Sequence, residues 1–166
     1  MMIGKKMQEA INRQIKEEMY SAYLYLAMSA YFESQNLKGF GHWVRIQAKE
    51  EMGHAMRFYD YVVERLGRVT LGAIEQPTSE WKGATEVFEQ VLSHEQKVTG
   101  LINNLMEQAI AEKDYASQSM LKWFIDEQVE EEASADEILQ KLKIIKESPG
   151  ALLMLDKQLG KREEGK

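Results

Sequence analysis

Four acidic residues occupy positions in the middle of otherwise apolar helical stripes, where a carboxylate is least expected. They are Glu18, Glu51, Glu95 and Glu131. An uncompensated buried carboxylate costs several kcal/mol, and four that converge on one level would also repel one another. Two divalent cations would balance the four charges. The pattern therefore predicts a metal site with two ions inside a helical bundle.

A histidine sharpens this prediction. His54 lies three residues after Glu51, on the same helical face one turn along. Glu-x-x-His on a bundle helix is the building block of dinuclear carboxylate sites. Imidazole with carboxylate suits iron, manganese or zinc, whereas calcium and magnesium prefer oxygen ligands alone. Gln128 stands one turn before Glu131 and adds an amide. Any single acid could be a snorkelling or paired core residue, but one on each helix favours metal.

These side chains require four long helices to position them. Apolar residues recur at alternating three- and four-residue steps, which is typical of a bundle interior. No strand-like alternation of useful length is present. Turn residues divide the chain into helices expected at 6–36, 40–67, 84–112 and 115–147, with a short helix at 151–160.

The connections between these helices predict how they are arranged. Short joints after the first and third helices imply antiparallel hairpins. The segment 68–83 is long for a bundle and could run its full length, so that the second and third helices lie parallel. The sequence therefore predicts a single all-α domain over residues 1–166. It is a four-helix bundle with one long crossover and a short fifth C-terminal helix.

Composition narrows the function further. The 166 residues are 44% hydrophobic, which suits one compact domain. The formal net charge of -6 argues weakly against nucleic acid as a partner. The absence of cysteine excludes disulfides, thiolate zinc sites and iron–sulfur clusters. Neither a secretory h-region nor a membrane-spanning apolar run is visible, so a cytoplasmic protein without a membrane partner is expected.

Four stretches of the chain resemble the non-haem bacterial ferritins, and the likeness covers nearly the whole sequence. They are EEMYSAYLY at 17–25, AKEEMGHAMR at 48–57, SHEQ at 93–96 and WFIDEQVEEE at 123–132. The resemblance implies a ferritin-like five-helix subunit and a hollow cage of 24 copies of this chain. It also implies ferroxidase activity, with dioxygen or peroxide oxidising Fe(II) to Fe(III). Iron would be stored and detoxified as ferric oxyhydroxide inside the cage.

The resemblance also implies roles for individual residues. Glu18, Glu51 and His54 match ligands of a first iron, and Glu51 would bridge to a second iron. That second iron would be held by Glu95 and Glu131, with Gln128 close by.

A third iron site of the family matches Glu50, Glu127 and Glu130, with Glu131 as a possible shared ligand. These acids face away from the apolar stripe, so the alternative interpretation is an ordinary solvated acidic face. Tyr25 and Trp123 match aromatic residues near the family's centre. Tyr25 could donate an electron or hydrogen-bond a ligand, or it could simply pack in the core.

Related families fit less well. Bacterioferritins carry a second Glu-x-x-His on the last helix, where this chain has Gln128 and Glu131. The second metal therefore lacks a histidine, which predicts a more exchangeable ion. Met52 stands where bacterioferritins place their haem ligand, but non-haem ferritins also have methionine there, so no haem is expected. The alternatives are a di-iron or di-manganese oxidase of a small organic substrate, a structural cage with a disabled centre, and a helical interaction module.

Overall fold

The computed structural model describes residues 1–146 and 148–165, and within them the chain is helical, with no strand. The predicted all-α class is confirmed. Within the same ranges, no helix combines the length and the apolar character needed to cross a membrane. The five helices are α1 (Lys5–Ser34), α2 (Lys38–Glu64), α3 (Ala84–Ala111), α4 (Tyr115–Ile145) and α5 (Pro149–Leu159).

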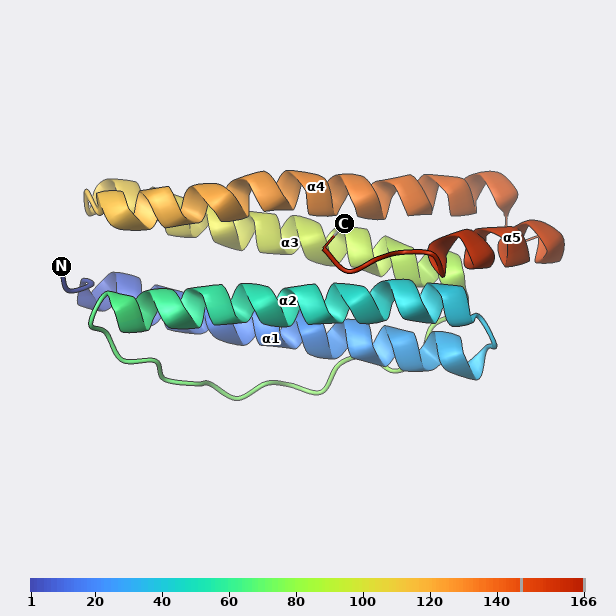
Figure 1. The fold of residues 1–166 in the computed structure, drawn as a ribbon, viewed down its shortest axis with the longest axis horizontal. Coiled ribbons are helices and arrows are strands. Elements are labelled where there is room, and N and C mark those ends of the chain that lie inside the picture. The colour runs from blue at the N-terminus through green and yellow to red at the C-terminus, as the bar shows by residue number, and fades with distance from the viewer. Residues whose placement is uncertain (147, 166) are drawn as a thin grey trace.

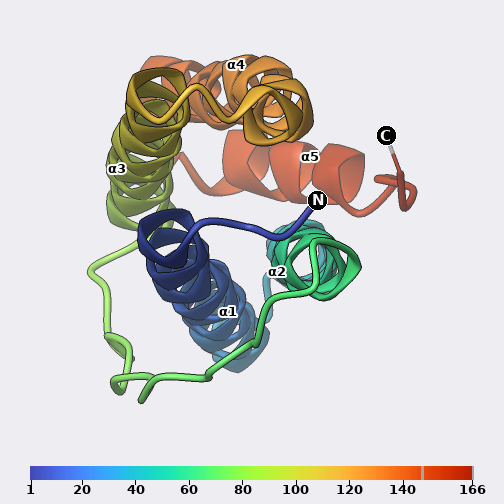
Figure 2. The ribbon, with the colours of Figure 1, turned by 90° about the vertical axis from the view of Figure 1, so that its left-hand side faces the viewer.

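The long helices form two antiparallel hairpins, α1 with α2 and α3 with α4 (Figure 1). Residues 65–83 run along the outside of the first hairpin for much of the bundle's length, so that α3 starts at the end where α2 starts (Figure 1). The predicted parallel arrangement of these two helices is therefore confirmed. Viewed from the end, the four long helices surround one common interior (Figure 2).

The helix ends differ from the prediction by one to three residues. A residue with left-handed backbone follows each long helix, and an α-helix cannot continue through it. These residues are Asn36, Leu66, Lys113 and Lys146. The predicted ends at 36, 67 and 112 were therefore too late, and the predicted end at 147 lies outside the described residues. The second helix starts two residues earlier than predicted, and so does α5, because proline suits the first turn of a helix.

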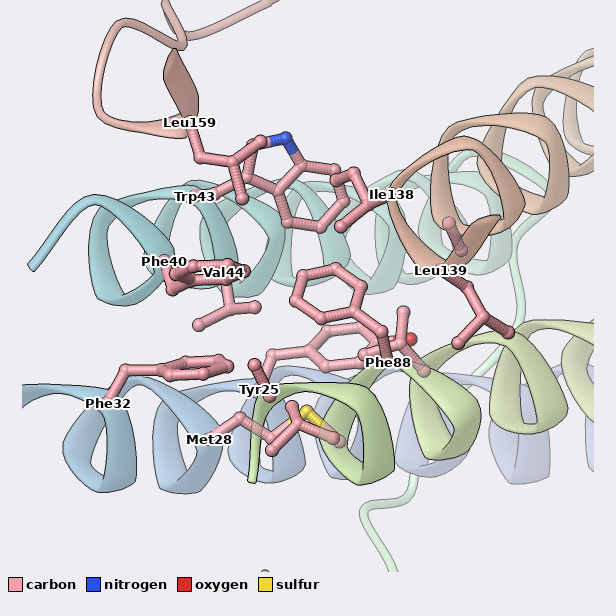
Figure 3. Close-up of a cluster of buried hydrophobic side chains, with 14 of the residues drawn as sticks. Tyr25, Met28, Phe32, Phe40, Trp43, Val44, Phe88, Ile138, Leu139 and Leu159 are labelled. Atoms are coloured by element: carbon pink, nitrogen blue, oxygen red, sulfur yellow. The ribbon is translucent and has the colours of Figure 1, made fainter. Parts of the chain in front are cut away.

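The hydrophobic core consists of two clusters with the acidic level between them. One cluster lies toward α5 and includes Phe32, Phe40 and Phe88 (Figure 3). The other lies toward the N-terminus and includes Phe58 and Phe124, whose rings stack at 4.0 Å. Both clusters draw side chains from all four long helices, so packing on either side fixes the height and rotation of each helix at the acids.

The short helix α5 packs against the end of the bundle beside α2 and α4 (Figure 2). Leu155 and Leu159 are buried there in the first core cluster. Asp156 accepts a hydrogen bond from the backbone N–H of Phe40 at 2.9 Å. Gly39 lets the two backbones approach this closely, since a Cβ atom at that position would lie 1.7 Å from the carbonyl oxygen of Asp156. The early start of α2 thus follows from a contact with α5.

Asp114 joins two helix ends. Its carboxylate accepts from the backbone N–H of Ser117 at 3.1 Å, capping α4, and lies 3.1 Å from the guanidinium of Arg65 at the end of α2. Replacing Asp114 by Ala is expected to destabilise the protein by about 1–2 kcal/mol, because the cap and a half-buried ion pair are both lost. Differential scanning calorimetry of the metal-free protein measures this loss.

Asp126→Ala provides the matched control for this prediction. Asp126 lies on the same helix and pairs with Lys122 at 2.8 Å, but both side chains are largely exposed. An exposed pair of this kind contributes little, so Tm is expected to stay nearly unchanged. Equal losses in the two variants would show that Asp114 has no special role.

Candidate metal centre

The four acids predicted from the sequence meet at one level in the middle of the bundle. Glu18 comes from α1, Glu51 from α2, Glu95 from α3 and Glu131 from α4, and none is more than 7% exposed. The neighbouring stripe residues are apolar and pack into the two core clusters above and below. The helical periodicity on either side thus forces the carboxylates inward, where water cannot solvate them.

The first ligand group is formed by side chains of α1 and α2. Glu18, Glu51 and His54 each place a potential ligand atom within 4.8 Å of the others. His54 Nδ1 lies 3.4 Å from Oε2 of Glu51 and 3.9 Å from Oε2 of Glu18. All three atoms are buried and have no hydrogen-bond partner. Buried polar atoms are normally paired, so three unpaired ones that face one another fit a cation that is coordinated between them.

A second group shares Glu51 with the first. Glu51, Glu95 and Glu131 also present ligand oxygens within 4.8 Å of one another. Gln128 donates its amide nitrogen to Oε2 of Glu95 at 3.1 Å, so that amide nitrogen faces Glu95. Tyr25, which is fully buried, donates its hydroxyl to the other oxygen of Glu95. The structure therefore places Tyr25 in contact with a candidate ligand.

Two amides that the sequence reading missed orient the acids of the first hairpin. Gln14 donates to Oε1 of Glu18 at 3.1 Å, and Gln47 donates to Oε1 of Glu51 at 3.1 Å. Each glutamine precedes its glutamate by four residues on the same helix. This repeated spacing is visible in the sequence and could have indicated both amides. Each hydrogen bond occupies one carboxylate oxygen and leaves the other free for a metal.

A buried histidine lies behind Tyr25. The Nε2 atom of His94 is 2.7 Å from the hydroxyl of Ser21, and the ring meets the Tyr25 ring edge-on at 5.9 Å. Burial lowers the pKa of His94 to about 4, which keeps the imidazole neutral. His94 therefore packs and orients its neighbours without adding positive charge to the centre.

The residues predicted for a third iron are only partly brought together. Glu127 forms a ligand group with His54 and Glu131. Glu50 instead lies 3.1 Å from the guanidinium of Arg162, and Glu130 is exposed. Both nevertheless line the same open pocket as Glu127. His54 and Glu131 also line this pocket, so it reaches the edge of the candidate centre from the surface.

Trp123 forms part of the wall of this pocket. Its ring meets His54 edge-on at 5.5 Å, and the guanidinium of Arg57 lies 3.7 Å from its centroid. The indole thus packs between the guanidinium on its face and the imidazole at its edge, and helps to fix the orientation of the His54 ring.

Burial raises the pKa of every carboxyl group in the centre. The pKa values of Glu18 and Glu51 lie well above the usual range because burial and neighbouring acids both disfavour the charged forms. Burial and the charge of Glu95 raise the pKa of Glu131 to about 8, and burial raises that of Glu95. The metal-free centre must therefore hold protons, which bound cations would displace.

These shifts predict that the metal-free protein loses stability as pH rises. Between about pH 4.5 and 8, the folded state keeps protons that the unfolded state releases, so the free energy of unfolding falls across this window. The full contribution is present below pH 4.5, where both states are protonated. Tm is expected to be several degrees lower at about pH 8 than at about pH 6. Calorimetry of the metal-free protein across this range measures the decrease.

Two comparisons test the origin of this pH dependence. Saturating divalent metal is expected to remove most of the decrease, because the cations replace the protons. The Glu131→Gln variant is expected to show a smaller decrease than the wild-type chain. A decrease that is the same in all three samples would place its cause outside the metal centre.

Comparison with known proteins agrees with this geometry. A family model described as a ferritin-like domain matches residues 8–145. The chain is 45% identical over 161 residues to a bacterial non-haem ferritin of Bacteroides fragilis, covering 97% of this chain and 100% of that one. It is 38% identical to a bacterial non-haem ferritin of Staphylococcus aureus, covering 97% of each chain.

Solved structures that resemble this chain are also ferritins. An open pore ferritin from the hyperthermophilic archaeon Archaeoglobus fulgidus superposes with a TM-score of 0.96 at 53% identity, covering 97% of this chain and 98% of that one. A closed form of that ferritin, engineered by site-directed mutagenesis, superposes equally well. With the fold, the carboxylate and histidine cluster and these matches in agreement, the chain belongs to the ferritin family of iron-storage proteins.

Proposed function

We propose that this chain oxidises Fe(II) to Fe(III) at a dinuclear centre inside each subunit and stores the product within a cage. Iron storage and a general ferroxidase activity follow from membership of the family. The observation that carries the dinuclear centre is the pair of ligand groups that share Glu51. A single carboxylate common to both groups is suited to bridge two ions.

We assign each ligand a specific role that the contacts support. The first iron is held by Glu18, Glu51 and Nδ1 of His54, the atoms that lack other partners. The second iron is held by Glu51, Glu95 and Glu131, all of them oxygen ligands. Without a histidine the second site is harder and more exchangeable, which favours release of ferric iron toward storage.

The remaining residues assist these ligands. Gln128 and Tyr25 donate hydrogen bonds to the two oxygens of Glu95 and fix its orientation. Each ferrous ion loses one electron, and the pair reduces dioxygen to peroxide, or peroxide to water, with protons taken up from solvent. The carboxylates favour the ferric product because hard oxygen ligands bind the higher charge more tightly.

A third iron is proposed at the mouth of the pocket. Glu127 and Glu131 would hold it together with Glu130, and Glu50 would join once it leaves Arg162. The ligand group of Glu127, His54 and Glu131 supports this position. An ion there lies on the route between the dinuclear centre and the surface.

We also propose that 24 copies of this chain form the cage, in the cytoplasm and without haem. Assembly of several copies follows from the family. Exposed apolar side chains at the α5 end of the subunit support contacts between copies, notably Ile144 at 78% and Met154 at 76% exposure. Sedimentation of the purified protein measures the number of subunits.

An anaerobic titration tests the proposed function. Fe(II) is added to the metal-free protein, air is then admitted, and ferric absorbance is followed. The wild-type chain is expected to saturate near two or three irons per subunit and to oxidise them rapidly. The Glu51→Ala/His54→Ala double variant, checked for intact assembly, is expected to lose both properties. Iron oxidation no faster than in buffer would overturn the ferroxidase proposal.

The same titration separates the competing function. An oxidase of a small organic substrate would bind two metals without depositing a mineral. Continued uptake of iron far beyond the saturating amount is expected here, because stored iron accumulates outside the catalytic site. Uptake that stops at two ions would favour the oxidase.

A further inference from the structure

The C-terminal tail places an arginine against the outer edge of the metal centre. Residues 160–165 turn back from α5 along the bundle (Figure 1). The guanidinium of Arg162 lies 4.1 Å from the ring centroid of Trp43 and donates to the Trp43 carbonyl oxygen at 3.0 Å. The backbone carbonyl of Arg162 accepts from His42 at 2.8 Å, and its side chain is only 11% exposed. This arginine is therefore fixed in position, unlike a typical surface arginine.

Arg162 reaches two candidate metal ligands through one amide. Its Nη2 donates to the side-chain oxygen of Gln47 at 3.0 Å. The nitrogen of Gln47 donates to Oε1 of Glu51 at 3.1 Å and to Oε2 of Glu131. Arginine has only donors, so the amide oxygen must face Arg162, and the amide nitrogen is left to face Glu51 and Glu131. Arg162 thus determines which end of Gln47 faces the carboxylates.

The same nitrogen of Arg162 also holds Glu50. It donates to Oε2 of Glu50 at 3.1 Å, in a pair whose two side chains are 11% and 25% exposed. Glu50 belongs to none of the ligand groups, although it lines the pocket with Glu127 and Glu130. The C-terminal tail, through Arg162, therefore holds the carboxylate of Glu50 in an ion pair at the pocket.

We propose that Arg162 is a positioning residue for the second iron. Through Gln47 it aligns Glu51 and Glu131, and its ion pair keeps the carboxylate of Glu50 from binding a metal in the pocket. This inference rests on the proposed function, since it concerns ligands of the same centre. A tail residue more than 100 positions away from Gln47 thereby influences how tightly the more exchangeable ion is bound.

Cobalt(II), which dioxygen does not oxidise in such sites as readily as Fe(II), serves as the probe. Anaerobic calorimetric titration of the intact metal-free protein measures the stoichiometry and affinity at each site. Arg162→Met keeps the length of the side chain but removes its donors. It is expected to weaken the second Co(II) by about 10-fold, as loss of a partner outside the ligand shell commonly does. The first Co(II), which also has Glu18 and His54 as ligands, is expected to lose less affinity than the second.

Further variants separate positioning from a general structural effect. Arg162→Lys retains charge but cannot serve Trp43, Gln47 and Glu50 together, so partial recovery of affinity is expected. In a Gln47→Leu background, Arg162→Met is expected to have a much smaller effect on the second Co(II), because the route through the amide is already broken and only the release of Glu50 remains. Glu164→Ala removes only the exposed tail contact to Lys49 and is expected to match the wild-type chain.

The outcomes distinguish the inference from the function on which it rests. Wild-type protein that binds fewer than two Co(II) ions per subunit would overturn the proposed dinuclear centre itself. Two tight ions in both the wild-type chain and Arg162→Met would leave the centre intact and overturn the role of Arg162. Fully additive effects of the Arg162 and Gln47 substitutions would also overturn it, because Arg162 would not then act through the amide.

Discussion

Replacing Glu51 by Gln is expected to abolish rapid iron oxidation and, at the same time, to stabilise the metal-free protein. Glu51 is fully buried and is the one residue common to both dinuclear ligand groups. The neutral amide of the introduced glutamine cannot bridge two cations as a carboxylate does. The initial rate of iron oxidation should therefore fall by roughly 100-fold or more. Stopped-flow absorbance after mixing Fe(II)-loaded protein with aerated buffer measures the rate.

The expected gain in stability has an electrostatic origin. Burial and the charges of Glu95 and Glu131 raise the pKa of Glu51 well above its usual range. At about pH 8 the wild-type chain must either hold a proton or bury a repelled charge, and the amide avoids both costs. Removing this cost is expected to add about 1–3 kcal/mol to the free energy of unfolding of the metal-free protein. Calorimetry in the presence of a chelator measures it.

Glu64→Gln is the matched control, because Glu64 is an exposed acid on the same helix. It is expected to change neither the oxidation rate nor Tm. If Glu51→Gln oxidises iron at the wild-type rate, Glu51 does not bridge the two ions. If the variant is instead less stable without metal, hydrogen bonding by the carboxylate outweighs its burial cost.

Replacing Gly39 by Ala is expected to release α5 from the bundle. The added Cβ atom would lie 1.7 Å from the carbonyl oxygen of Asp156 and 2.6 Å from its carbonyl carbon. Both are backbone atoms, so neither can move without moving α5. Displacing the helix exposes Leu155 and Leu159, which each contribute roughly 1.5–3 kcal/mol by burial. Hydrogen exchange of residues 149–162, followed by mass spectrometry, is expected to accelerate strongly.

The metal centre should respond to the same substitution. The tail that carries Arg162 follows α5 directly, so its loss from the bundle would also free Gln47 and Glu50. Weaker binding of the second Co(II), as in Arg162→Met, is therefore expected. The half of the bundle near the N-terminus should keep its protection from exchange, because the core cluster around Phe58 and Phe124 contains no residue of α5.

Gly100→Ala is the control for Gly39→Ala. Gly100 is a helical glycine of α3 with nothing within 4 Å of an added Cβ atom. Alanine there is expected to stabilise the protein by about 0.5–1 kcal/mol, since it removes the flexibility of a glycine in a helix. Unchanged exchange at α5 in both variants would show that the close approach at Gly39 is not needed for docking.

The sequence alone determined the bundle and its acidic level. An apolar stripe recurs locally every three or four residues, so an acid within it must face inward in any bundle that these helices form. The stripes alone therefore predict that Glu18, Glu51, Glu95 and Glu131 face the interior. The length of the crossover likewise predicted that α2 and α3 could lie parallel, as the structure confirms.

Helix ends were predicted less accurately from the sequence because tertiary contacts determine them. The start of α2 depends on the close backbone contact that Gly39 allows between α2 and α5. The left-handed residues after the long helices include leucine and two lysines, which carry no turn signal in the sequence. Where local preferences are weak, packing decides where a helix ends.

Only the tertiary structure decided which polar side chains hydrogen-bond to the candidate ligands from outside the ligand groups. Gln47 and Glu131 are 84 positions apart, and Glu50 and Arg162 are 112 apart. Whether such polar side chains meet depends on helix packing and rotamer choice, which leave no periodic trace in a single sequence. The sequence therefore determined which carboxylates face inward, and the fold decided which of their oxygens are hydrogen-bonded and which have no hydrogen-bond partner.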